Sequence, residues 1–370
     1  MKKIVKTNLV LIGAGPIGIE MAAALKTSNI EYIHLEAGCL ASTINWYAPG
    51  TPFFSSPERL SIAGIPLETY PHFKITREEY LLYLRSVVVK FNLQISFFSK
   101  VQSITTNLEQ EFEITVTKSP TGVGGPRHNE LRTELNTSST RHLLAKKIIF
   151  AIGDMHHPKY LEIEGENGPF VSHFLPDPHS LSFMKVAIVG GKNSAVEAAI
   201  RLYRAGAKVT LIHRRANFDP KKVKPWLLPE LKALIREGKI EIEMETKVIK
   251  IDENTVSLKK TNDDAKPIKK IDCDYTLLLT GYAQDSSLFE QTGIKLTGKA
   301  KKPEINNETN ETNVKNAFII GTAVAGTQID GAKHFIETGH IHINRVLRKL
   351  GIKEYPLYSG NIRNEDEREN

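Results

Sequence analysis

Two separate stretches of the chain carry the same succession of apolar and polar positions. In the first, a glycine-rich turn and an alanine-rich stretch at 17–26 lie between apolar runs at 8–12 and 32–35. In the second, a glycine-containing turn and a stretch at 194–205 lie between apolar runs at 185–189 and 208–212. Short apolar runs bounded by turn residues indicate buried strands, and the longer stretch between them indicates a helix. Each stretch therefore predicts a strand-helix-strand unit.

The rest of the pattern predicts smaller elements around these two units. Residues 76–91 have apolar positions at helical spacing, with Thr76 as N-cap and Glu79 in the capping-box position. Alternating segments between 94 and 150 predict an antiparallel meander, and its polar stretch at 119–139 is expected to be a disordered hairpin tip. Further along we expect strands at 275–279 and 317–320, a helix at 331–349 and a fraying polar tail from 356.

Length and composition limit the class of protein. A chain of 370 residues suggests two to three domains, and 41% apolar with 25% charged residues is typical of a globular protein. No apolar run approaches the roughly 20 residues that cross a bilayer, so we expect no membrane association. The segment from Met1 to Ile19 superficially imitates a secretory signal, but its glycines and proline would break a signal helix. We therefore expect a cytoplasmic protein.

The net charge of +7 comes from one region. Residues 185–270 contain 20 lysines and arginines against 11 acidic residues, a local balance of +9. Such a region could serve nucleic acid, an acidic protein or a phosphorylated small ligand. The basic residues lack interleaved aromatic residues, which argues against nucleic acid. The lysines between 259 and 270 are instead expected to form a solvated face.

The first glycine turn has the full pattern of a dinucleotide site. It reads Gly13-Ala14-Gly15-Pro16-Ile17-Gly18. In such a turn Gly13 permits the tight bend, Gly15 lets a pyrophosphate approach the backbone, and Gly18 lets helix and strand pack closely. Glu36 ends the next strand, where a carboxylate accepts hydrogen bonds from ribose hydroxyls and repels a 2′-phosphate. The turn therefore favours FAD or NAD over NADP, the alternative being glycines that serve packing alone.

The second turn differs from the first in its charges. It reads Gly190-Gly191-Lys192-Asn193-Ser194-Ala195, so a lysine stands where the middle glycine is usual. His213, Arg214 and Arg215 follow the next strand, at the position that Glu36 has in the first unit. Guanidinium groups there can bind a 2′-phosphate through paired hydrogen bonds, which favours NADPH. Lys221, Lys222 and Lys224 extend the positive region, although an ordinary basic strand end would look the same.

With both turns placed, the chain resembles the thioredoxin-reductase-like pyridine nucleotide flavoproteins. Within them it is most similar to the bacillithiol-disulfide reductases and related thioredoxin reductases that lack C-x-x-C. The segments that carry this narrower resemblance are 53–60, 190–194, 224–230 and 311–314. The resemblance implies an α/β fold with two Rossmann-like three-layer domains, the NADPH domain being inserted into a split FAD domain. We expect FAD parts at 1–154 and 284–352, an NAD(P)H domain at 155–283 and a tail at 353–370.

The same resemblance implies further contacts with FAD. Apolar strands ending at Gly153 and Gly321 resemble segments that complete the FAD site near the ribityl chain and the flavin ring. The aspartate that usually follows the second of these glycines is Thr322 in this chain. The FAD contacts implied by the resemblance also include Pro16, Ile17, Thr43, Phe54 and Ser55.

Thiol chemistry has no obvious residue in this sequence. The two cysteines, Cys39 and Cys273, lie far apart, without C-x-x-C or zinc-ligand spacing, so no metal is expected. The resemblance places the family's reactive cysteine at Ile17, and 172–176 stands where a thioredoxin reductase would carry its C-x-x-C. Asp272 and Asp274 flank Cys273 and should raise its pKa. We therefore expect no disulfide reduction through a cysteine of this chain.

The expected activity is hydride transfer from NADPH to FAD, followed by electron transfer to an acceptor that the sequence does not identify. This transfer depends on aligning nicotinamide and flavin more than on any acid or base, so no catalytic side chain is assigned. A small molecule or a small redox protein would be the acceptor, and the resemblance implies a homodimer. The alternatives are a flavin monooxygenase, a ferredoxin–NADP or flavodoxin–NADP reductase of the same fold, and a non-catalytic redox sensor.

Overall fold

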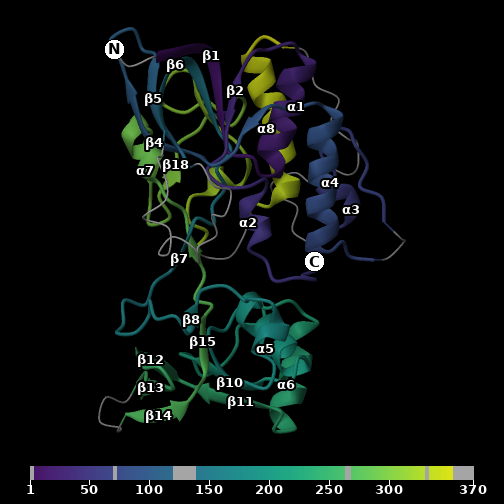
Figure 1. Ribbon diagram of the computed structural model, residues 1–370, viewed down its shortest axis with the longest axis vertical. Helices are drawn as coiled ribbons and strands as arrows, with labels where there is room; N and C mark the ends of the chain where they lie inside the picture. Colours follow the sequence, from purple (N-terminus) through teal and green to yellow (C-terminus); the bar gives the residue numbers. More distant parts are fainter. Residues whose placement is uncertain (1–3, 70–72, 120–138, 263–267, 330–332, 353–370) are drawn as a thin grey trace. The chain divides into compact units, whose positions relative to one another are not determined.

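A computed structural model of the chain describes residues 4–69, 73–119, 139–262, 268–329 and 333–352 (Figure 1). The chain forms two compact units. Unit 1 comprises residues 1–46, 50–157 and 283–370, and unit 2 comprises 47–49 and 158–282. Residues 158–282 of unit 2 are thus inserted between two parts of unit 1. The short strands β7 (His157–Pro158) and β16 (Tyr282–Ala283) contain the boundaries of the insertion.

Unit 1 is built on a sheet in the order β3-β2-β1-β6-β5-β4, with β19 paired to β6. Its parallel strands are β1 (Ile4–Ile12), β2 (Ile33–Leu35), β3 (Ile95–Ser96), β6 (Ser139–Phe150) and β19 (Ala317–Ile319). The expected meander is present, because β4 (Ser99–Thr106) and β5 (Phe112–Lys118) run antiparallel next to β6. Two short strands, β17 (Leu296–Thr297) and β18 (Lys302–Pro303), form a separate hairpin.

Helices cover the sheet of unit 1. They are α1 (Pro16–Thr27), α2 (Ser42–Asn45), α3 (Pro57–Leu60), α4 (Arg77–Lys90), α7 (Ser287–Thr292) and α8 (Ile336–Lys349), with a 3₁₀ turn, η2 (Gly321–Ala325). Figure 1 shows α1 and α8 side by side, and α1 also contacts α4. The capping box expected at Thr76 is present: the Glu79 amide donates to the Thr76 hydroxyl, and the Glu79 carboxylate accepts from the Thr76 amide.

Unit 2 repeats the strand-helix-strand plan. Its parallel sheet has the order β11-β10-β9-β15-β8, made of β8 (Val171–Ser172), β9 (Lys185–Val189), β10 (Lys208–His213), β11 (Ile240–Met244) and β15 (Tyr275–Leu278). Helices α5 (Asn193–Arg204) and α6 (Leu227–Arg236) and a 3₁₀ turn, η1 (Pro178–Leu181), accompany it. An antiparallel sheet of β12 (Thr246–Ile251), β13 (Thr255–Lys260) and β14 (Lys269–Asp272) completes the unit.

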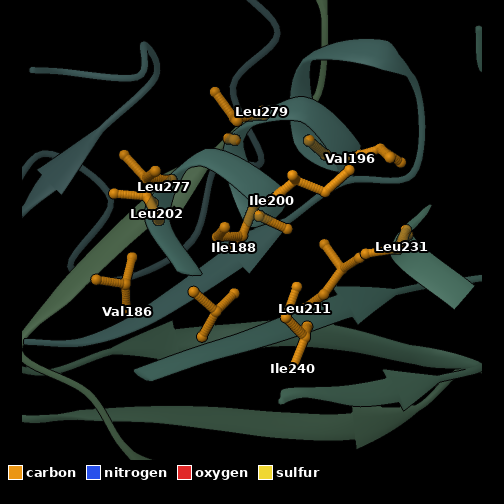
Figure 2. Close-up of a cluster of buried hydrophobic side chains, with 14 of the residues drawn as sticks. Val186, Ile188, Val196, Ile200, Leu202, Leu211, Leu231, Ile240, Leu277 and Leu279 are labelled. Atoms are coloured by element: carbon orange, nitrogen blue, oxygen red, sulfur yellow. The ribbon is translucent and has the colours of Figure 1, made fainter. Parts of the chain in front are cut away.

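Alternation along β9 explains the three layers of unit 2. Val186 and Ile188 belong to a core that includes Val196 and Ile200 of α5 (Figure 2). Ala187, which lies between them in the strand, belongs to a second core with residues of β12 and β13. Because successive side chains of a strand point to opposite faces, the parallel sheet is covered by helices on one side and by the antiparallel sheet on the other. The predicted fold class is confirmed.

The main differences from the predicted elements lie in the last part of the chain. The C-terminal helix begins at Ile336, because Phe335 has extended backbone angles and its N–H donates to the Thr338 hydroxyl. The prediction of a helix from 331 was therefore wrong at its start, and residues 330–332 lie outside the described part. The predicted hairpin tip, apart from its two end residues, and the predicted tail also lie outside it. Within the described ranges, no helix is both long and apolar enough to cross a bilayer.

Candidate functional site: two glycine turns

Both glycine turns lie where the strand order of their sheet reverses. β1 has β2 on one side and β6 on the other, and β9 has β10 on one side and β15 on the other. In open α/β sheets, ligands bind in the crevice beyond the carboxyl ends of the strands at this reversal point. The turn after each of these strands is therefore the candidate site of its unit.

The three glycines of the first turn have different surroundings. A Cβ atom at Gly13 would lie 2.4 Å from the Ala151 carbonyl oxygen, and one at Gly18 would lie 2.1 Å from the Gly13 carbonyl oxygen. These two glycines allow β1, α1 and the end of β6 to pack closely. A Cβ atom at Gly15 would meet nothing within 4 Å. Gly15 therefore faces open space, as expected for the position that a pyrophosphate approaches.

The start of α1 is suited to an anion. Its first intrahelical bond runs from the Ile19 amide to the Gly15 carbonyl oxygen, 2.9 Å, so the amides of Ile17 and Gly18 precede the hydrogen-bond ladder. The first turn of the helix has no acidic residue. Such an N-terminus combines orphan N–H donors with the positive end of the helix dipole. This turn can hold a phosphate group.

Glu36 holds the first turn and can still bind a ribose. Its Oε2 accepts from the Ala14 amide at 2.6 Å, and its Oε1 accepts from the Gly38 amide at 2.8 Å and the Ser42 hydroxyl at 2.9 Å. A carboxylate offers about four acceptor positions, so these three bonds leave capacity at Oε2. The side chain is buried yet lies at the end of β2, beside the turn. Glu36 can therefore accept from one further hydroxyl donor.

The ends of β6 and β19 lie next to this turn. Ile319 pairs with Phe150, which brings the following segments, with Gly153 and Gly321, to the same edge of the sheet. A Cβ atom at Gly321 would lie 3.3 Å from the Ile17 Cβ, and one at Gly153 would lie 3.8 Å from the Thr322 hydroxyl. The structure thus brings together the segments of the first site that the sequence separates widely.

The other residues expected near FAD are placed less uniformly. Thr43 lies in α2, directly after Ser42, which donates to Glu36. Pro16 is the first residue of α1. Ser55 is buried just before α3, whereas Phe54 is partly exposed, with the Lys74 ammonium 5.3 Å from its ring centroid.

The second turn is shaped by a histidine. A Cβ atom at Gly191 would lie 2.1 Å from Nδ1 of His213, so only glycine leaves room for this ring. His213 Nδ1 is 3.1 Å from the Gly190 carbonyl oxygen and Nε2 is 3.3 Å from that of Asn217. The ring stacks on Phe218, with centroids 4.9 Å apart, and burial lowers the pKa of His213. The structure therefore places this imidazole beneath the turn as a support, although the sequence suggests a ligand contact.

Five cationic side chains gather around the second turn. Burial lowers the pKa of Lys192, and the positive charges of Lys222, Lys159, Arg215 and Arg214 lower it further. Arg214 and Arg215 are exposed at the end of β10. Like charges that influence one another in this way repel, although the Lys222 ammonium also lies 3.7 Å from the Asp219 carboxylate, and a bound anion relieves the remaining repulsion. This group, which we call the cationic cluster, is suited to phosphate.

The remaining residues of the second turn organise the helix start. The first bond of α5 runs from the Val196 amide to the Lys192 carbonyl oxygen, 3.1 Å, so the amides of Asn193, Ser194 and Ala195 precede the ladder. The Asn193 side chain accepts from the Lys224 amide at 2.7 Å. The Lys224 ammonium lies 3.6 Å from the Glu197 carboxylate, so part of its charge is compensated.

Two acidic or basic residues near these turns were not singled out from the sequence. Lys159 joins the cationic cluster from a loop before the unit 2 sheet, and no local motif indicates it. Asp154 directly follows Gly153, and this position after a strand-ending glycine is the sequence feature that could have indicated a site residue. Both depend on contacts between segments distant in the sequence.

Neither cysteine has the surroundings of a reactive thiol. Burial raises the pKa of Cys39, and the Glu36 carboxylate raises it further. Burial is also the largest cause that raises the pKa of Cys273, with a smaller contribution from Asp274. The direction predicted for Cys273 is thus confirmed, but burial is its main cause. No group of metal-binding side chains occurs among the residues that the structure describes.

Comparisons with known proteins agree with this arrangement. Residues 10–122 and 127–321 match the pyridine nucleotide-disulphide oxidoreductase family. Over 350 residues the chain is 32% identical to bacilliredoxin reductase Bdr of Bacillus subtilis (strain 168), covering 95% of this chain and 99% of the relative. It is 30% identical to the solved bacillithiol disulfide reductase Bdr of Bacillus cereus, with a TM-score of 0.82 over 93% of this chain and 98% of that one. The corresponding enzyme of Staphylococcus aureus gives 30% identity and a TM-score of 0.80 over 94% and 98%.

Proposed function

The chain belongs to the pyridine nucleotide-disulphide oxidoreductase family and is a flavoprotein oxidoreductase, and on this premise we propose that unit 1 binds FAD and unit 2 binds NADPH. Electrons then pass from NADPH through FAD to a small molecule or a small redox protein. The observation that carries the proposal is the opposite charge at the two equivalent strand ends. Glu36 directly follows β2, and Arg214 and Arg215 directly follow β10.

The residues of unit 1 fit FAD. Gly15 leaves open space at the start of α1, and Glu36 has a free acceptor position for a ribose hydroxyl. A carboxylate at this position disfavours a 2′-phosphate, so FAD suits unit 1 better than NADPH does. Bound FAD supplies a two-electron acceptor, and the side chains of unit 1 would hold and orient it.

The residues of unit 2 fit NADPH. The amides at the start of α5 face the position of a pyrophosphate, and the cationic cluster can bind the additional 2′-phosphate. Arginine donates to phosphate through two parallel hydrogen bonds, which gives both affinity and selectivity. NADH lacks this phosphate and would leave the repulsion within the cluster in place.

The final acceptor of this chain need not be the one suggested by its relatives' names. Those names describe bacilliredoxin and bacillithiol disulfide as substrates. In this chain Ile17 stands where the family resemblance places a cysteine, and Ile17 is buried against Gly321 and Gly339. A disulfide would therefore have to accept electrons from the flavin without a thiol of this chain. We also propose a homodimer, as the resemblance implies, and a cytoplasmic location, because the glycines and proline near the N-terminus would break a signal helix.

Anaerobic titration of the purified holoprotein tests the two cofactor sites together. NADPH should bleach the flavin band at about 450 nm. Replacing Arg214 and Arg215 together by alanine should raise the NADPH concentration needed by about ten- to a hundredfold, because losing the charge-assisted contact with the 2′-phosphate costs about 1.5–3 kcal/mol in total. The NADH concentration needed to reduce the flavin should change little.

A matched control variant distinguishes the loss of the contact with the 2′-phosphate from the loss of positive charge in general. Lys232 and Lys239 are exposed in unit 2 and outside the cationic cluster, so replacing both by alanine removes the same charge. This control should leave the NADPH requirement near that of the parent. Equal effects of the arginine variant on NADPH and NADH would contradict the proposed phosphate contact.

A further inference from the structure

A carboxylate lies next to the position where the family resemblance predicts an aspartate. Thr322 occupies that position, directly after Gly321. Asp154 directly follows Gly153 on the neighbouring strand end, where the Thr322 hydroxyl interacts with its carboxylate and lowers its pKa. The carboxylate that is missing after Gly321 is thus present after Gly153, at the adjacent strand end.

One glutamine side chain holds the Asp154 carboxylate, and another holds the backbone beside it. Gln328 Nε2 donates to Asp154 Oδ2 at 2.7 Å, and Gln328 Oε1 accepts from the Lys333 and His334 amides at 2.5 and 3.1 Å. Gln284 Nε2 donates to the carbonyl oxygens of Gly153 and Ala323, at 2.8 and 3.1 Å, and so ties the two strand ends together. Both the carboxylate and the backbone that carries it therefore have fixed positions.

The hydrogen bonds present determine what else this pair can bind. An amide N–H can only donate, so Oδ2 of Asp154 accepts from Gln328. The Thr322 hydroxyl has one proton, and when that proton is directed at Asp154 its oxygen can only accept. Burial raises the pKa of Asp154, whereas the bond from Gln328 and the nearby Thr322 hydroxyl lower it in part. The pair thus presents acceptors to a ligand, which suits hydroxyl groups and repels phosphate.

We propose that Asp154, together with Thr322, accepts hydrogen bonds from the hydroxyl groups of the FAD ribityl chain, in place of an aspartate at position 322. The proposal rests on the binding of FAD to unit 1. The ribityl chain is the part of FAD that carries several hydroxyl donors between the pyrophosphate and the flavin ring. The phosphates are bound instead by the N–H donors at the start of α1.

A transfer of the carboxylate between the two positions tests this inference. Holoproteins are dialysed to equilibrium, and the released FAD is measured by its fluorescence. Asp154→Ala should weaken FAD binding about ten- to a hundredfold, as expected for the loss of a charge-assisted contact. Asp154→Asn keeps an acceptor for Gln328 and should give a smaller loss. Adding Thr322→Asp to Asp154→Ala should restore most of the affinity.

The thermal midpoint of the FAD-free variants separates binding from folding. Asp285→Ala is the matched control, since Asp285 lies in unit 1 and accepts from the Ser287 amide at the start of α7. It should leave FAD affinity unchanged. The inference is overturned if Asp154→Ala binds FAD with the parental affinity. It is also overturned if Asp154→Ala lowers both the thermal midpoint and the FAD affinity and the addition of Thr322→Asp restores neither. A parent protein that retains no FAD would instead overturn the proposed function.

Discussion

At the scale of single residues, the glycines of the first turn are required for different physical reasons. Gly18 is required by packing, because any side chain there would collide with the Gly13 carbonyl. Gly15 has ordinary backbone angles, with φ −75° and ψ 179°, and no neighbour near a Cβ atom. The structure of the protein alone does not require glycine at position 15, whereas a pyrophosphate approaching the backbone would.

This difference gives a prediction for two alanine variants. Gly15→Ala should leave the thermal midpoint of the FAD-free protein unchanged and weaken FAD retention about tenfold, because the added methyl group lies in the phosphate position. Gly18→Ala should destabilise the FAD-free protein by about 1–3 kcal/mol or more through overpacking. Differential scanning calorimetry and dialysis against buffer measure the two effects. A large loss of midpoint in Gly15→Ala would contradict this assignment.

At the scale of elements, an ion pair joins α1 to α8. His340 Nδ1 lies 2.7 Å from the Glu20 carboxylate, and its Nε2 lies 3.0 Å from the Arg59 carbonyl oxygen. Burial is the largest single effect and lowers the pKa of His340, but the Glu20 carboxylate, the Arg59 carbonyl and Glu337 together outweigh it, and the pKa rises from 6.5 to about 9. Two of the helices that cover the sheet of unit 1 are therefore connected by a charged contact.

The raised pKa makes this contact dependent on pH. A histidine bound more tightly in its protonated form stabilises the fold fully below pH 6.5, and the contribution is lost as the pH rises through about 9. We expect His340→Gln to lower the free energy of unfolding by up to about 3 kcal/mol at pH 6, and by much less at pH 10. Urea unfolding at both pH values measures this. His179→Gln, at an exposed site in η1, should retain the parental pH dependence.

At the scale of the whole molecule, each unit contains one cysteine, and neither thiol is activated by its surroundings. Cys273 is buried in unit 2, with its Sγ 3.2 Å from the Thr276 hydroxyl, and Cys39 follows the strand end that carries Glu36. Raised pKa values keep both thiols protonated at neutral pH, and a protonated thiol is a poor nucleophile. Electrons should therefore leave the flavin directly.

The double variant Cys39→Ser, Cys273→Ser tests this expectation. Its NADPH oxidation with a quinone or another small acceptor should be within about twofold of the parent, since neither thiol has a role in the proposed transfer. The same assay with a low-molecular-weight disulfide provides the contrast. Disulfide-dependent oxidation that is present in the parent and absent from the variant would show that a thiol of this chain participates.

The sequence by itself determined the two strand-helix-strand units, their glycine turns and the opposite charges at their strand ends. These features depend on residues near one another in the chain, where local backbone preference and side-chain periodicity act directly. Only the tertiary structure decided which side chains meet. It turned the His213 ring beneath the second turn, brought Lys159 to the cationic cluster and placed Asp154 beside Thr322. Packing between distant segments sets such contacts, and no local pattern encodes them.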